Sequence, residues 1–269
     1  MGQPSLRLRH AVTLGLLHGP AELLPISSSG HTALIPWLAG WNYEDLDPAA
    51  RKRFEVALHA GAIVGVLVVM RGEIASTVVG LGARRIGVLA LATVPAAAAG
   101  VVFQRPIERY LGKPGSIAAG LLGGSASMAL ADRVGSRERH IGEATALDGL
   151  TLGLAQAVAL IPGVSRSGAA LTAARARGFA PVDAERLAFE VGLPVTIGAL
   201  ALKGREALSA DRAEWTSLAG GAAAAFVSTV ASGTVARKLG KGGSLLPYAA
   251  YRTALAGTVL RRLRHNAAR

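Results

Sequence analysis

The chain has 269 residues, of which 51% are hydrophobic and only 17% are charged, and its mean hydropathy is +0.40. Soluble domains carry about 25% charged residues, so this composition predicts an integral membrane protein, and the absence of cysteine excludes disulfides and cysteine metal sites. The net charge of +12 comes from basic clusters beside apolar runs, which favours contact with anionic lipid head groups over a nucleic-acid partner.

Apolar stretches follow one another in the same order in both halves of the chain. The first half has a broken stretch at 11–40 and then three continuous ones at 54–70, 86–104 and 115–131. The second half has a broken stretch at 147–180 and continuous ones at 187–202, 216–236 and 244–262. A bilayer crossing needs roughly 20 mostly apolar helical residues. The six continuous stretches therefore predict one crossing each.

The two broken stretches contain the same motif at an offset of 138 residues. Residues 15–30 read G-L-L-H-G-P-A-E-L-L-P-I-S-S-S-G, and residues 153–168 read G-L-A-Q-A-V-A-L-I-P-G-V-S-R-S-G. In each copy, an apolar helical run ends at a proline and opens into a turn rich in serine and glycine. Each half-helix is short for a crossing, and such a turn is tolerated at membrane depth only where protein or a wet cavity covers it. We therefore expect two re-entrant helical hairpins.

The repeat extends beyond the hairpins, because residues 54–58 (F-E-V-A-L) match residues 189–193 (F-E-V-G-L). Three crossings after each hairpin would invert the second half relative to the first. The sequence thus predicts an all-α integral membrane protein: a polytopic helical bundle with about six transmembrane helices plus two re-entrant helical hairpins in an inverted-topology repeat. We expect one membrane domain over 1–269, with inverted repeats at about 11–140 and 147–262.

Titratable and hydroxyl side chains gather in the first hairpin. His18 and Glu22 share one helix face because they are four residues apart, and Ser27, Ser28, Ser29 and His31 follow the break. A carboxylate and an imidazole near a hydroxyl can form a nucleophile with its base. Alternatively, the serines bond the backbone freed at the break, and His18 only packs between helices.

The second hairpin contains the sequence P-G-V-S-R-S-G over residues 162–168. Arg166 keeps its charge when buried and so needs an anion. The flanking hydroxyls, the glycines and a helix that starts after the turn resemble a phosphate cradle. The alternative is that Arg166 pairs with an internal carboxylate, namely Glu22, Glu55 or Glu190. Gln156 stands at the position that His18 occupies in the first copy.

Three isolated charges lie inside the predicted crossings: Glu55, Glu190 and Arg252. They either bind a cation or pair with one another. Together, these features predict a membrane chamber for a substrate with an anionic phosphate head and an apolar tail, which the protein hydrolyses or moves.

Both long motifs, together with L-P-Y-A-A-Y-R over 246–252, resemble the bacterial undecaprenyl-diphosphatase family, also called the bacitracin-resistance family. The resemblance implies an enzyme of the bacterial plasma membrane that hydrolyses undecaprenyl diphosphate to the monophosphate and phosphate. This reaction recycles the lipid carrier of peptidoglycan synthesis and protects against bacitracin. The resemblance also implies a divalent cation, Mg²⁺ or Ca²⁺. Expected partners are the bilayer and a long-chain prenyl diphosphate, and a homodimer stays open.

The resemblance also assigns roles to residues. Ser28 would attack the terminal phosphorus with Glu22 as base or metal partner, His31 would assist proton transfer, and Arg166 would hold the diphosphate. Attack by water without a phosphoserine is the alternative mechanism. The expected substrate-binding residues are Ser27, Ser29, Gln156, Gly163, Ser165, Ser167 and Gly168.

Four positions depart from the family pattern: His18 replaces Glu or Gln, His59 replaces Gln, Ala170 replaces Thr, and Glu190 adds a carboxylate. His18 and Glu22 are the expected metal ligands, and His18 suits a metal less hard than Mg²⁺. Glu190 would restore the negative charge that His18 lacks. A translocase for a prenyl phosphate or another anion, and a divergent paralogue with another substrate, are the alternative functions.

Overall fold

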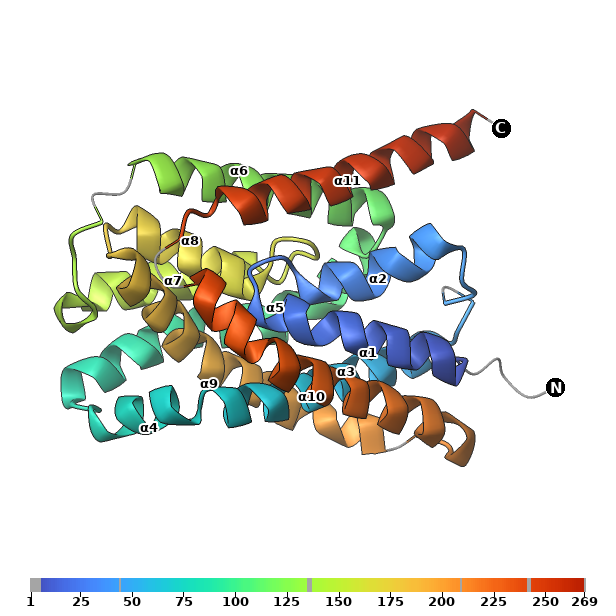
Figure 1. The fold of residues 1–269 in the computed structure, drawn as a ribbon, viewed down its shortest axis with the longest axis horizontal. Helices are drawn as coiled ribbons and strands as arrows, with labels where there is room; N and C mark the ends of the chain where they lie inside the picture. The colour runs from blue at the N-terminus through green and yellow to red at the C-terminus, as the bar shows by residue number, and fades with distance from the viewer. Residues whose placement is uncertain (1–5, 44, 135–136, 209, 241–242, 269) are drawn as a thin grey trace.

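The computed structural model describes residues 6–43, 45–134, 137–208, 210–240 and 243–268, and these segments are almost entirely helical (Figure 1). Within these ranges the extended pairing is limited to one isolated bridge between Arg139 and Phe179. The prediction of an all-α protein is therefore confirmed.

The first half of the chain forms α1 (Leu8–Leu23), α2 (Ser28–Ala39), α3 (Pro48–Val69), α4 (Arg71–Val79), α5 (Ala83–Leu111) and α6 (Pro114–Val134). The second half forms η1 (Ile141–Glu143), α7 (Ala146–Val158), α8 (Arg166–Ala176), α9 (Pro181–Leu208), α10 (Arg212–Gly240) and α11 (Leu246–Ala267). Each of the six continuous stretches falls on one long helix. The helices α4 and η1 lie outside the predicted stretches.

Two helical segments among the described residues are both long and apolar enough to cross a membrane alone, Ala83–Ile107 in α5 and Glu214–Ala236 in α10. A third candidate is the pair α3 and α4, which bends by 70°. Of the other long helices, α9 and α11 carry more charged residues, and α6 is rich in glycine and serine. These findings fit a polytopic helical membrane protein.

Glycines bring the helices of the two halves into close contact. A Cβ atom added at Gly61 of α3 would lie 2.0 Å from the carbonyl oxygen of Ala222 in α10, and one at Gly15 of α1 would lie 2.3 Å from that of Gly221. In the same way, Gly153 of α7 meets the carbonyl of Leu91 in α5. Small residues at helix contacts are typical of membrane bundles, where dispersion rather than water exclusion drives association.

The two broken stretches form the helical hairpins α1–α2 and α7–α8. These hairpins extend from opposite ends of the bundle, and their turns meet near its middle (Figure 1). The helices α6 and α11 lie side by side along one edge. This arrangement places the two polar turns next to each other, although they are 138 residues apart in the sequence.

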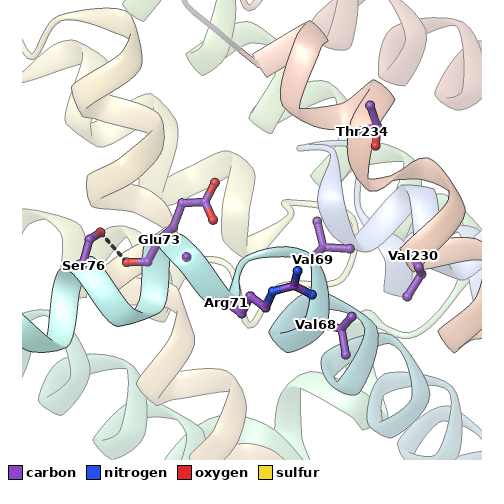
Figure 2. A pocket seen from close by; sticks show the side chains of 8 residues that line it. Val68, Val69, Arg71, Glu73, Ser76, Val230 and Thr234 are labelled. Atoms are coloured by element: carbon purple, nitrogen blue, oxygen red, sulfur yellow. Dashed lines mark hydrogen bonds between the residues drawn. The ribbon is translucent and has the colours of Figure 1, made fainter.

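One cavity lies at the bend between α3 and α4 (Figure 2) and has a volume of about 650 Å³. Its lining includes Arg71, Glu73 and Thr234, and the Ser76 hydroxyl donates to the Glu73 main-chain carbonyl at 2.8 Å. None of the predicted site residues lines this cavity. It is therefore separate from the candidate functional site.

Candidate functional site

The turn of the first hairpin is held by Ser27. Pro25 interrupts the chain after α1, and Ser27 takes the left-handed backbone conformation with φ of 76°. The Ser27 hydroxyl caps α2 by accepting a hydrogen bond from the Gly30 amide at 3.3 Å. A positive φ is costly outside glycine, so the turn stores strain next to Ser28, the first residue of α2.

Ser165 holds the second turn in the same way. Its φ is 71°, and its hydroxyl accepts from the Gly168 amide at 3.2 Å. Arg166 is then the first residue of α8 and corresponds to Ser28 across the repeat. The alternative that a serine bonds the backbone freed at the break is thus confirmed for Ser27. The side chains of Ser28 and Arg166, at the N-termini of α2 and α8, do not cap these helices.

Both turns open into one cavity of about 580 Å³ between α1, α2, α3, α5, α7, α8 and α9. Its lining has a polar part and an apolar part. The apolar part comes mainly from alanine, valine, leucine and proline side chains of α5 and α9. The predicted site residues that line it are Glu22, Ser27, Ser28, Ser29, Gln156, Ser165, Arg166 and Ser167.

Glu22 is the centre of the polar part. The Ser28 hydroxyl donates to Glu22 Oε2 at 2.6 Å, and Arg166 Nη2 donates to Glu22 Oε1 at 3.0 Å. The Glu22 side chain is only 7% exposed, whereas that of Arg166 is 29% exposed toward the cavity. The internal ion pair considered for Arg166 is therefore present, with Glu22 as the partner. The same contact joins the two hairpins.

Two histidine side chains, those of His18 and His59, also lie close to the Glu22 carboxylate. His18 Nε2 lies 3.7 Å and His59 Nδ1 lies 3.5 Å from Glu22 Oε2, and these two nitrogens are 3.3 Å apart. The three donor atoms could hold a metal ion. His59 lines the cavity, and sequence reasoning did not place it in the site. The signals in the sequence were its departure from the family pattern and its position directly after the repeated segment 54–58.

His31 is not in direct contact with this group. Its Nδ1 bonds the Ser27 carbonyl oxygen and its Nε2 bonds the Tyr251 hydroxyl, each at 2.7 Å. The ring also stacks on Tyr251. His31 is buried and lies behind the turn rather than on the cavity wall. It therefore holds the Ser27 turn, and direct proton transfer at the reacting atoms does not follow from its contacts.

The glycines of the second turn also differ from the expected phosphate cradle. Gly163 has φ of 95° and packs against the Ile117 carbonyl of α6, and a Cβ at Gly168 would lie 2.6 Å from Met128. Neither lines the cavity. Gln156 does line it, but its amide donates to the carbonyls of Ala92 and Val191. The two glycines pack the second turn against α6, and Gln156 joins α7 to α5 and α9.

The isolated charges do not pair with one another. Glu55 pairs with Lys52 at 3.4 Å, and Glu190 accepts hydrogen bonds from Arg85, Arg186 and Thr77. The Glu190 carboxylate is thus occupied away from the cavity, so the expectation that it replaces the charge missing at His18 is wrong. Ala170 is fully buried in the core and also does not line the cavity.

Arg252 is the most consequential residue that sequence reasoning misassigned. It is fully buried, and its guanidinium donates to the carbonyls of Pro25, Gly163 and Val164 rather than to a carboxylate. It therefore ties both turns to α11. Its place inside an apolar run was a signal that it mattered, but the sequence pointed to charges as its partners and not to main-chain carbonyls.

A family model described as bacitracin resistance protein BacA matches residues 11–258. The chain belongs to the BacA family. The undecaprenyl-diphosphatase of Geobacter sulfurreducens is 37% identical over 269 residues, which cover 94% of this chain and 97% of that protein. The proteins of the same name are 35% identical in Moorella thermoacetica (93% and 95% covered) and 40% identical in Geobacter metallireducens (72% and 74% covered). The family resemblance of both hairpin motifs is confirmed.

Proposed function

We propose that this BacA-family protein is an undecaprenyl-diphosphatase of the bacterial plasma membrane. It hydrolyses undecaprenyl diphosphate to undecaprenyl phosphate and phosphate, which recycles the lipid carrier for peptidoglycan synthesis and gives resistance to bacitracin. The observation that carries the proposal is the 2.6 Å hydrogen bond from Ser28 to Glu22 in a cavity that has both polar and apolar walls. The relatives in Geobacter sulfurreducens and Moorella thermoacetica bear the name of this activity.

In the proposed reaction, Glu22 accepts the hydroxyl proton of Ser28 as Ser28 Oγ forms a bond to the terminal phosphorus. The bond from that phosphorus to the bridging oxygen breaks, and undecaprenyl phosphate leaves. Water then attacks the phosphoserine, which releases phosphate and returns the proton to Ser28. Direct attack by water activated at Glu22 gives the same products. The two routes differ in that only the first forms a phosphoserine.

Arg166 is proposed to hold the diphosphate. In the free protein its guanidinium donates a hydrogen bond to Glu22. A diphosphate that enters the cavity carries more negative charge and would bind this guanidinium more strongly. The amides at the starts of α2 and α8 add positive partial charge from the two sides. Fixed donors of this kind stabilise the negative charge that spreads over the phosphoryl oxygens during transfer.

We further propose that the chain is one membrane domain with six crossings and two re-entrant hairpins in inverted repeats. The packing supports this plan. The contact of α1 with α10 has its counterpart in α7 with α5, and the contact of α3 with α10 has its counterpart in α9 with α5. The contacts of α3 with α9 and of α6 with α11 join equivalent helices of the two halves, as an inverted repeat predicts.

The cation that the resemblance implies is Mg²⁺ or Ca²⁺, and the donors around Glu22 do not fit it well. Both ions take oxygen ligands, whereas His18 and His59 offer two nitrogens beside a single carboxylate. No step of the proposed reaction is therefore routed through Mg²⁺ or Ca²⁺.

Release of phosphate from a long-chain prenyl diphosphate by the purified protein tests the proposal. We expect release by the wild type and its loss in Glu22→Gln. A wild-type protein that transfers a prenyl phosphate between leaflets of a vesicle without releasing phosphate would instead identify it as a translocase. Absence of release under every divalent cation tested would refute the hydrolase.

A further inference from the structure

We infer that His18, Glu22 and His59 form a binding site for a transition-metal cation of the Zn²⁺ class. The inference deepens the proposed function, because the site adjoins Ser28, but the binding itself can be measured without any reaction. It also replaces the cation that the family resemblance implies. The two histidines that depart from the family pattern are the residues that create the site.

The spacing of the donor atoms is close to, and on two edges slightly wider than, that of a small tetrahedral site. His18 Nε2, His59 Nδ1 and Glu22 Oε2 form a triangle with edges of 3.3, 3.5 and 3.7 Å. Tetrahedral Zn²⁺ with bonds of about 2.0–2.1 Å needs edges of about 3.3–3.4 Å. An octahedral Mg²⁺ face with bonds of the same length needs edges of only about 2.9 Å. Three donors on one side of an ion leave the fourth position open.

The tautomer of His18 is set by its neighbours. The Thr32 hydroxyl donates its single proton to the Ser28 carbonyl oxygen at 3.1 Å. It must therefore accept a hydrogen bond from His18 Nδ1, which lies 3.2 Å away. A neutral His18 that carries its proton on Nδ1 presents a lone pair on Nε2 toward Glu22 and His59. An outer hydrogen bond that orients the ring in this way is typical of histidine metal ligands.

Donor chemistry decides between the ions. Imidazole nitrogen suits Zn²⁺, Co²⁺ and related ions, whereas Mg²⁺ and Ca²⁺ prefer oxygen. Ca²⁺ bonds of 2.3–2.6 Å would accommodate the spacing, but two of the three donors are nitrogens. The donor set therefore favours a transition metal.

The donor group borders the substrate cavity. His18 is buried, but the His59 side chain is 35% exposed, and both His59 and Glu22 line the cavity. Ser28 Oγ is 2.6 Å from the ligand oxygen of Glu22. A bound ion would thus have room for a water molecule or a phosphate oxygen next to the proposed nucleophile.

Metal binding by the full-length protein in detergent tests the inference. Chelator-stripped protein is dialysed against Zn²⁺ and its metal content is measured, and Co²⁺ is used as a probe with visible absorption bands. We expect one tightly bound equivalent of Zn²⁺ that a large excess of Mg²⁺ does not displace. We also expect Co²⁺ absorption typical of four-coordinate nitrogen and oxygen ligation.

Variants identify the ligands. We expect His59→Gln, which changes a partly exposed residue, and His18→Gln to lose the tight equivalent. Thr32→Val should weaken Zn²⁺ binding by about 10–100-fold, because it removes only the outer hydrogen bond. His140→Gln is the matched control, since His140 is exposed and bonds Asp183 at 3.2 Å, far along the chain from this group. His18→Glu should shift the preference toward Mg²⁺.

Tighter binding of Mg²⁺ or Ca²⁺ than of Zn²⁺ would overturn the inference. So would unchanged Zn²⁺ content and affinity in a folded His59→Gln protein. Phosphate release by the same preparations separates the two proposals. Zn²⁺ binding that depends on His59 without phosphate release refutes the hydrolase and leaves the metal site intact, whereas phosphate release by a protein that binds no tight equivalent of Zn²⁺ refutes the metal site alone.

Discussion

Arg252 donates a hydrogen bond to the main-chain carbonyl of Val164 at 2.8 Å. The same guanidinium reaches the carbonyl of Gly163 at 3.0 Å and that of Pro25 at 3.4 Å. Main-chain carbonyls freed at a break in a buried helix need donors. One side chain from α11 thus satisfies both hairpin turns and fixes their relative position.

Removal of the Arg252 guanidinium should therefore damage stability and catalysis together. We expect Arg252→Gln to lower the free energy of unfolding by about 3 kcal/mol, because each buried carbonyl left without a donor costs about 1–3 kcal/mol. The turnover number should fall because Ser28 and Arg166 lose their fixed separation. Thermal unfolding in detergent and the rate of phosphate release are the measurements. Arg261→Gln, at an exposed position of the same helix, should change neither, and a fully active Arg252→Gln protein would contradict the positioning role.

Ser28 is expected to be indispensable for phosphate release. Its hydroxyl bonds Glu22 rather than the backbone, so Ser28→Ala should reduce the turnover number by at least about 100-fold while the protein stays folded. The matched control is Ser127→Ala, because Ser127 is exposed and bonds only the Gly124 carbonyl of its own helix. Acid quenching with substrate labelled at the terminal phosphate should trap label on Ser28. Loss of activity in Ser28→Ala without trapped label in the wild type would favour direct attack by water.

Glu190 and Glu55 are both isolated carboxylates within predicted crossings, but their surroundings differ in the structure. Glu190 is buried and accepts from Arg186 at 3.0 Å and from Thr77 at 2.9 Å, besides its contact with Arg85. Loss of one partner from a buried ion group costs about 3–5 kcal/mol, and we expect this loss of stability in Glu190→Gln. Glu55→Gln removes a half-exposed pair and should cost less than about 1 kcal/mol.

Kinetics on the folded fraction give the second half of this test. Because Glu190 lies outside the cavity, the KM for the prenyl diphosphate should be unchanged in Glu190→Gln. A rise in KM with little loss of stability would instead show that Glu190 contributes to substrate binding.

The helices and the site were predictable from the sequence to different degrees. Apolar length and the duplicated motif predicted the long helices and both breaks, because those follow from local composition and proline. The motif also brought Glu22, Ser28 and Arg166 together, since a repeat implies related positions in space. The partners of Arg252 and Glu190 were not predictable, because they depend on which helix faces which. His59 joins Glu22 only through the packing of α3 against α1.

Gly61 tests the close helix contacts that the fold requires. A Cβ atom at this position would lie 2.0 Å from the Ala222 carbonyl oxygen, which is main chain and cannot move aside alone. Gly61→Ala should therefore lower the free energy of unfolding by about 1–3 kcal/mol, as overpacked cores do. Gly257→Ala is the control, because Gly257 is also inside a helix and no atom lies within 4 Å of its added Cβ. Alanine is the better helix former by about 1 kcal/mol, so Gly257→Ala should be neutral or stabilising. Thermal unfolding of both variants in the same detergent measures the difference, and equal stability of the two would contradict the close approach of α3 and α10.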